Sequence, residues 1–260
     1  MSTTFGALIK NWRDIRRYSQ LALSTETGIS SRHISFLETG RAKPSRGSVL
    51  TLARVLDMPK PIVNDALLAA GFAPEYPKHE PSDVDLEPMV EAMAAILANH
   101  TPFPAIIIDG GWQIVGGNDP AIQMMQFLPF QGSMCVVEAL LNDDPVNPVF
   151  LNWAEIAAWT LTRLQLETSR AGPETELVNT YKRLASDPRC DGAEPASFSG
   201  RRPYLTMKAQ IDRKELSMFT MLAEFTSAQD IAMSERRVEL FFPADDETRA
   251  YFENLAAMTA

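Results

Sequence analysis

The chain of 260 residues has few of the residues that build cross-linked or metal-binding proteins. Its two cysteines are too few for a disulfide framework and lack the spacing of metal ligands. No apolar run approaches the roughly 20 residues that a membrane-spanning helix needs. The first residues, MSTTFGALIKNW, lack the charged start and long apolar centre of a signal peptide. We therefore expect a cytoplasmic protein with no metal site and no membrane partner.

Signatures of catalysis are missing as well. The sequence has no Gly-rich phosphate loop, no paired metal ligands and no nucleophile elbow. Its three histidines, His33, His79 and His100, fall in three different parts of the chain. We therefore expect no catalytic residues, no enzymatic activity and no cofactor.

Negative charge predominates, but it is unevenly distributed. The net charge is −9, yet residues 1–54 carry nine Lys and Arg against three Asp and Glu. This balance of +6 leaves −15 for the remainder, which predicts that only the basic part approaches phosphate. The length favours two domains, and the apolar fraction of 45% is that of a soluble protein with real cores.

The basic part has the pattern of five short helices. Ser19 and either Ser30 or Ser31 are predicted N-caps, whereas Gly28 and Gly71 are predicted to end helices. Apolar residues recur at helical spacing in residues 5–18, 20–28, 31–39, 47–56 and 62–70.

The second and third of these helices have the layout of a DNA-binding helix-turn-helix. Leu23, Ile29, Ile34 and Leu37 fall where two helices crossing at a wide angle share a small core, and Gly28 lies between them. The second helix of such a motif lies in the major groove, and dimers read half-sites about one helical turn apart. We therefore predict a homodimer that binds a double-stranded DNA operator.

The outward-facing side chains of the helix at 31–39 are the predicted base-reading group. Arg32 suits guanine O6 and N7, and Phe36 suits a thymine methyl group. Gln20 and the loop cations are expected at phosphates. The predicted DNA-binding set is Gln20, Ser30, Ser31, Arg32, His33, Ser35, Phe36, Arg41, Lys43 and Arg46.

A buried ion pair is also expected in the basic part. Arg13 and Glu38 each lie beside apolar positions, on helices that must cross. Such a pair contributes rigidity more surely than stability.

The Pro-rich, charged stretch FAPEYPKHEPSDVDLEP predicts a linker. The predicted domains are residues 1–73 and 86–260, with the linker at 74–85. After the linker we expect helices at 86–99, 118–127, 152–167, 173–185 and 245–258, a hairpin in PAIIIDGGWQIVGG, and strands at 203–211, 215–226 and 237–242. This order predicts an α+β fold, in which one small antiparallel sheet has helices packed on one side.

A small sheet facing helices often encloses a pocket. Methionines in such a lining adapt to variable contents, and an apolar lining suits an acyl chain or a terpenoid. The same residues at the same spacing could simply fill a core, and Asn118 could equally cap a helix. The predicted pocket residues are Ile107, Val115, Asn118, Met124, Phe127, Trp153, Trp159, Met207, Phe219 and Met221, with Met125, Met134 and Met218 as further candidates.

Residues 5–71 resemble the repressor/Cro-like (XRE) helix-turn-helix family, through SQ, GISSRHISFLETGRAKPS and LLAAGFAP. The fuller pattern is similar to the branch whose second half is an MmyB-like, PAS-type ligand-binding domain. That similarity continues through PFPAIIIDGGWQIVGGN and NWAEIA. The resemblance implies an all-α, five-helix DNA-binding domain followed by a PAS-like sheet with packed helices. It also implies a transcription regulator that takes a small apolar effector such as a fatty acid.

Two alternatives for the second domain stay open. It could be a ligand-free dimerisation or protein-docking module, or a redox sensor that uses Cys135 and Cys190. The helix at 245–258 and the long helix from residue 152 are the candidate dimer surfaces. An enclosed apolar cavity would favour the ligand-binding alternative.

Overall fold

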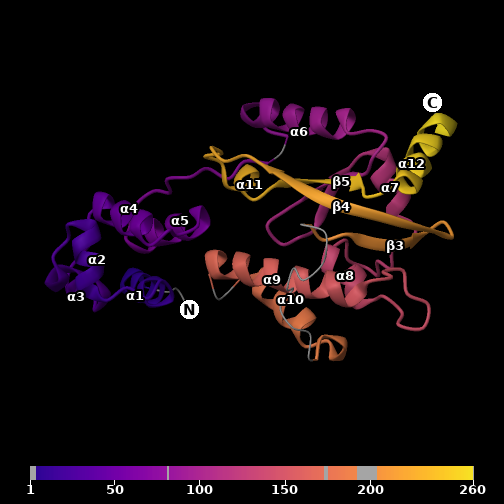
Figure 1. Ribbon diagram of the computed structural model, residues 1–260. Helices are drawn as coiled ribbons and strands as arrows, with labels where there is room; N and C mark the ends of the chain where they lie inside the picture. Colours follow the sequence, from indigo (N-terminus) through magenta and orange to yellow (C-terminus); the bar gives the residue numbers. More distant parts are fainter. Residues whose placement is uncertain (1–3, 81, 173–174, 192–203, 260) are drawn as a thin grey trace. The chain divides into compact units, whose positions relative to one another are not determined.

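The computed structural model describes residues 4–80, 82–172, 175–191 and 204–259 (Figure 1). Contacts within the chain divide it into two units. The first comprises the chain up to Lys78 together with two short segments, 169–174 and 229–231, and the second comprises the rest from His79 onward. Within the described ranges, no helix combines the length and apolarity needed to cross a membrane.

The described part of the first unit contains five helices, as the spacing predicts. Ser19 and Ser30 cap α2 and α3, because their hydroxyls accept hydrogen bonds from the backbone N–H groups of Ala22 and His33. Gly28 ends α2 with a left-handed φ of 73°, a conformation that glycine adopts without steric cost. The helices are α1 (Phe5–Ile15), α2 (Gln20–Thr27), α3 (Ser31–Glu38), α4 (Arg46–Val55) and α5 (Lys60–Ala69).

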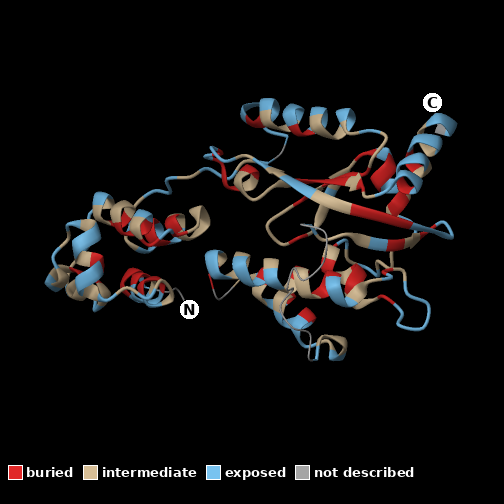
Figure 2. Cartoon of the chain, in the orientation of Figure 1, coloured by how far each residue is buried: buried red, intermediate tan, exposed pale blue. Residues whose placement is uncertain are grey.

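These helices share one apolar core, visible as the buried faces in Figure 2. Gly6 permits the close packing of α1 against the end of α3. A Cβ atom at this position would lie 2.5 Å from the backbone oxygens of Leu37 and Glu38. The fully buried side chains of this core are Ile9, Leu23, Ile34, Val49, Leu52, Leu56, Ala66 and Leu67.

The described part of the second unit is built on a five-stranded antiparallel sheet with strand order β2-β1-β5-β4-β3. The central strand, β5, pairs with β1 on one side and β4 on the other. The α+β class, a small antiparallel sheet with packed helices as in PAS-like domains, is confirmed. The strands are β1 (Ala105–Ile108), β2 (Ile114–Gly117), β3 (Met207–Ile211), β4 (Lys214–Glu224) and β5 (Arg237–Pro243).

Helices and short 3-10 turns complete the second unit. The helices α8 and α11 are not predicted, because each is too short to show a helical period. The predicted ends at Pro173 and Pro203 lie outside the described residues. The elements are η1 (Val84–Leu86), α6 (Glu87–Asn99), α7 (Asp119–Met125), α8 (Val136–Leu141), α9 (Trp153–Ala171), α10 (Glu176–Ala185), η2 (Pro188–Cys190), α11 (Ile231–Ser234) and α12 (Asp246–Thr259).

The prediction that helices pack on one side of the sheet is wrong, because helices lie on both faces (Figure 1). The reason is the composition of β5. Val238 and Leu240 belong to an apolar cluster with Met93 of α6. Glu239 and Phe241, at the alternate positions, face a cavity on the other side of the sheet. Both faces of the central strand are therefore covered.

Candidate functional site

The outer side of α3 gathers the predicted base-reading residues. Ile34 and Leu37 are buried in the core, so the intervening side chains of this helix point away from it. Arg32 is exposed, and its guanidinium carbon lies 5.4 Å from the centroid of the Phe36 ring. Ser31, His33, Ser35 and Phe36 are half-buried, and Ser30 is exposed at the N-cap.

The predicted phosphate-contacting residues divide into two kinds. Arg41 and Lys43 are exposed and have no ion-pair partner among the described residues. Arg46 instead donates to the backbone oxygen of Ala73 and forms an ion pair with Glu75. Gln20 donates through Nε2 to Oε2 of Glu38 at 2.8 Å. Within this structure, Arg46 and Gln20 are thus held by partners in the first unit.

The predicted ion pair between Arg13 and Glu38 is confirmed. Arg13 donates from Nε to Oε1 at 2.6 Å and from Nη2 to Oε2 at 3.2 Å. The Glu38 side chain is only 3% exposed, and its hydrogen bond raises the pKa of Arg13 above its ordinary value. Arg13 also donates from Nη1 to the backbone oxygen of Tyr18. The pair joins α1 to α3, and Gln20 joins α2 to Glu38 of α3, so this network fixes α3 against both neighbouring helices.

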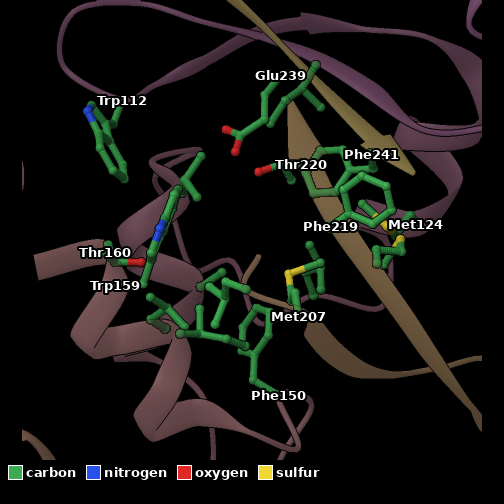
Figure 3. A pocket seen from close by; sticks show the side chains of 18 of the residues that line it. Trp112, Met124, Phe150, Trp159, Thr160, Met207, Phe219, Thr220, Glu239 and Phe241 are labelled. Atoms are coloured by element: carbon green, nitrogen blue, oxygen red, sulfur yellow. The ribbon is translucent and has the colours of Figure 1, made fainter. Parts of the chain in front are cut away.

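The second unit contains an apolar cavity of about 310 Å³ (Figure 3). It lies between the sheet and the helices α7, α8 and α9. The volume is near the lower end of the roughly 300–1,000 Å³ typical of small-molecule pockets. Its lining consists of Ile106, Trp112, Ile114, Met124, Met125, Leu128, Phe130, Val136, Ala139, Leu140, Phe150, Ile156, Trp159, Thr160, Arg163, Tyr204, Leu205, Met207, Met218, Phe219, Thr220, Glu239 and Phe241.

Four of the predicted pocket residues lie in this lining: Met124, Trp159, Met207 and Phe219. Two of the further candidates, Met125 and Met218, lie there too, whereas Met134 is 42% exposed. The structure thus brings together residues from α7, α9, β3 and β4 that are far apart in the sequence.

Three predicted pocket residues lie outside the lining because they are exposed. Val115, Phe127 and Met221 are 47%, 41% and 53% exposed. Val115 follows Ile114, which lines the cavity, so the alternation of the strand directs Val115 to the other face.

The other three have structural roles. Ile107 packs with the cluster on the α6 side of the sheet. Asn118 caps α7, accepts hydrogen bonds from the backbone N–H groups of Ala105 and Ala121, and donates to the backbone oxygen of Phe103. Trp153 donates from Nε1 to the backbone oxygen of Leu140.

Sequence reasoning missed a polar group at one end of the cavity. Arg163 of α9 lies with its guanidinium carbon 4.4 Å from the ring centroid of Trp112 and 5.4 Å from that of Trp159. It donates from Nε to Glu167 at 3.1 Å and from Nη1 to Glu239 at 3.4 Å. The i,i+4 spacing of Arg163 and Glu167 is the signal in the sequence, but it is also typical of a solvated helix face.

Glu167 links this group to the start of β5 and to the turn between β1 and β2. Its Oε2 accepts a hydrogen bond from Nε1 of Trp112 at 2.9 Å, and its Oε1 lies 2.6 Å from Nη1 of Arg237. Burial acts to raise the pKa of Glu167. The hydrogen bonds from Arg237 and Trp112, with the positive charges of Arg237 and Arg163, outweigh it and lower that pKa below its ordinary value. Glu167 is therefore ionised at neutral pH.

Neither cysteine has the environment of a reactive thiolate. Cys135 is buried and Cys190 half-buried, and both are free thiols. Burial raises the pKa of each thiol, which keeps both protonated at neutral pH and makes them poor nucleophiles. The described residues contain no group of three or more His, Cys, Asp or Glu able to hold a metal ion. These properties disfavour the redox-sensor alternative.

Comparison with known protein families gives two matches. Residues 9–61 match a helix-turn-helix family, and residues 89–255 match the MmyB-like transcription regulator ligand binding domain. A comparison with curated proteins finds no match. The second family match covers more than half of the chain and contains every residue of the cavity lining. This protein therefore belongs to the family of DNA-binding transcription regulators that carry an MmyB-like ligand-binding domain.

Proposed function

We propose that this regulator binds its operator in a sequence-specific way and responds to a small effector with a fatty-acid-like, apolar body. The observation that carries the proposal is the apolar cavity of about 310 Å³. Aromatic and methionine side chains such as Trp159, Met207 and Phe219 form much of its wall. A lining of this kind favours a hydrocarbon chain over a strongly hydrated ligand.

On the DNA side, the proposal assigns base contacts to α3. Arg32 is the residue that reads guanine, with Phe36 beside it and Ser31, His33 and Ser35 along the same side of the helix. Two features support this: these residues point away from the core, and Arg32 has no ion-pair partner among the described residues. Arg41 and Lys43 contact phosphates, since both are exposed cations just after α3.

We also propose that two copies bind a two-fold operator, because one recognition helix covers too few base pairs for a specific site. The helices α9 and α12 are the proposed dimer surfaces. They leave Leu166 and Met258 exposed, at 56% and 85%, and a second copy would cover such apolar side chains. Light scattering at micromolar concentration tests this proposal, which a monomer both free and on DNA contradicts.

Binding of the effector to the second proposed domain, residues 86–260, is coupled to binding of the operator by the first, residues 1–73. The linker at 74–85 connects them. A tenfold change in DNA affinity corresponds to about 1.4 kcal/mol of coupling, and DNA must change effector affinity by the same factor. Reciprocity is therefore part of the proposal.

The test begins with native mass spectrometry and lipid extraction of protein purified from its own host. The extracted compounds, and a series of medium-chain acyl compounds, are then titrated against operator affinity and melting temperature. Phe219→Ala in the cavity wall should change both responses, whereas Val115→Ala, on the exposed side of β2, should change neither. If no compound shifts melting temperature or operator affinity, the docking-module alternative replaces the effector.

A further inference from the structure

One side chain of the cavity lining, Arg163, has a buried hydrogen-bond donor without a partner among the described residues. Nη2 of Arg163 is buried and has no hydrogen-bond partner among the described residues. The other two nitrogens of this guanidinium donate to Glu167 and Glu239. An unpaired buried N–H destabilises a fold, so an acceptor on a ligand at this point is favoured.

An acceptor group lies on the same side of the cavity. Figure 3 shows the carboxylate of Glu239 and the hydroxyl of Thr220 pointing into the space, at some distance from Phe150 and Met207. Glu239 is 6% exposed, and the one side-chain hydrogen bond that it makes to the described residues is accepted by Oε1 from Arg163. The polar end of the cavity therefore offers a donor and acceptors together.

The charges at this end are already balanced. Arg163 and Arg237 pair with Glu167 and Glu239, two cations with two carboxylates. A third carboxylate, that of the exposed Glu224, lies 3.9 Å from Nε of Arg237. A ligand carboxylate would thus add an uncompensated negative charge to a buried, balanced group, and burying such a charge is strongly unfavourable.

We propose that the effector carries an uncharged group with both a donor and an acceptor, such as a primary amide or a hydroxyl, at the end of its apolar body. Its oxygen accepts from Nη2 of Arg163, and its N–H or O–H donates to Glu239. The apolar body then extends toward Met207 and Phe150. This inference rests on the proposed function, and it names the chemistry of the effector's polar end.

The experiment compares ten-carbon probes that differ only at that end: decanoate, decanamide and decan-1-ol. Binding to the full chain at pH 7.5 is measured by calorimetry, and by the fluorescence of Trp112 and Trp159, which lie beside Arg163. Decanamide should bind about tenfold or more tightly than decanoate, with decan-1-ol between them, because only decanoate brings a charge.

Glu239→Gln tests the reason for this preference. The substitution removes one negative charge and keeps a hydrogen-bonding side chain. The affinity for decanoate should therefore rise roughly tenfold, while the affinity for decanamide stays within about threefold of its value in the unsubstituted chain. Glu224→Gln is the matched control, because it removes a carboxylate from the surface beside Arg237 and leaves the lining unchanged. The ratio of the affinity for decanamide to the affinity for decanoate should be the same in this control as in the unsubstituted chain.

The outcomes separate this inference from the proposed function. Decanoate binding as tightly as decanamide, or more tightly, overturns the uncharged polar end and leaves an apolar effector in place. Failure of all three probes to bind, or to change operator affinity, overturns the proposed function as well. The ratio in the unsubstituted chain decides between these outcomes even if Glu239→Gln does not fold.

Discussion

The cations at and just after α3 differ in their ion pairing from four arginines of the second unit. In the first unit, Arg32, Arg41 and Lys43 extend from α3 and the loop after it, with no ion-pair partner among the described residues. In the second unit, Arg163, Arg183, Arg189 and Arg237 each have a carboxylate partner. An exposed cation gains from DNA by releasing counterions, whereas a cation with a protein partner has already lost part of that gain. The comparison shows that net charge says less about DNA binding than the pairing of individual cations.

The largest expected effect comes from breaking the buried ion pair of Arg13 and Glu38 in the first unit. Glu38→Ala leaves the largely buried Arg13 with only the exposed carboxylate of Asp14 as an ion-pair partner. Breaking a buried pair in this way costs up to about 3–5 kcal/mol. The five helices should lose protection against hydrogen exchange while the sheet of the second unit keeps its own. The double variant Arg13→Met/Glu38→Leu should recover part of the loss. Equal loss of protection in both units would show that the two do not unfold separately.

A smaller effect is expected at the unpaired arginine of α3. Arg32→Ala should weaken binding to the specific operator by about 1–3 kcal/mol and leave random DNA nearly unaffected, since a base contact is lost. Arg183→Ala is the control, because Arg183 is paired with Glu138 in the second unit. Competition binding with operator and random duplexes measures both. Equal losses of affinity for the two duplexes in Arg32→Ala would show that Arg32 does not contact bases.

Loss of a single phosphate contact should mainly change the salt dependence of DNA binding. Lys43→Ala should weaken all duplexes alike and reduce the slope of log affinity against log salt by about 1. Arg46→Ala should reduce that slope less, since Arg46 is already paired with Glu75. Filter binding from low to high salt gives the slopes. The pairing argument fails if Arg46→Ala has the larger effect.

The ion pairs of the second unit should determine part of its stability against unfolding by acid. The pKa of Glu167 is lowered from its ordinary value of 4.5 in the folded state. Its stabilising contribution is therefore fully present above about pH 4.5 and is lost as the pH falls through the folded-state pKa. Glu167→Gln should flatten the fall in melting temperature below pH 4.5, with Glu224→Gln as the surface control. A fall of unchanged steepness would mean that other groups govern acid unfolding.

Local signals in the sequence predicted the first unit well. The helix start at Ser19, the start at Ser30 or Ser31, and the stop at Gly28 depend on residues within one turn of the chain. They can therefore be predicted without knowing the fold, and the structure shows that Ser30 is the cap. The ion pair of Arg13 and Glu38 could be predicted as well, because both lie beside core positions on crossing helices.

The cavity could be predicted only in part. An apolar residue such as Phe127 or Trp159 has the same local pattern whether it lines a cavity, fills a core or lies exposed, and only the tertiary packing decides. Arg163 was missed for a related reason. A charged residue on a helix normally faces water, and its burial between Trp112 and Trp159 depends on a strand hairpin far away in the sequence.

The central position of β5 limits which insertions and deletions the protein can tolerate in this strand. Val238 and Leu240 contribute to the core on the α6 side, while Glu239 and Phe241 line the cavity. Inserting or deleting a single codon near the start of this strand would shift its register by one residue and exchange the two faces. Glu239 would then enter the apolar core, and two aliphatic side chains would replace the polar end of the cavity. Substitutions can therefore change the lining of the cavity, whereas a change in the length of β5 would remove the cavity and the core together.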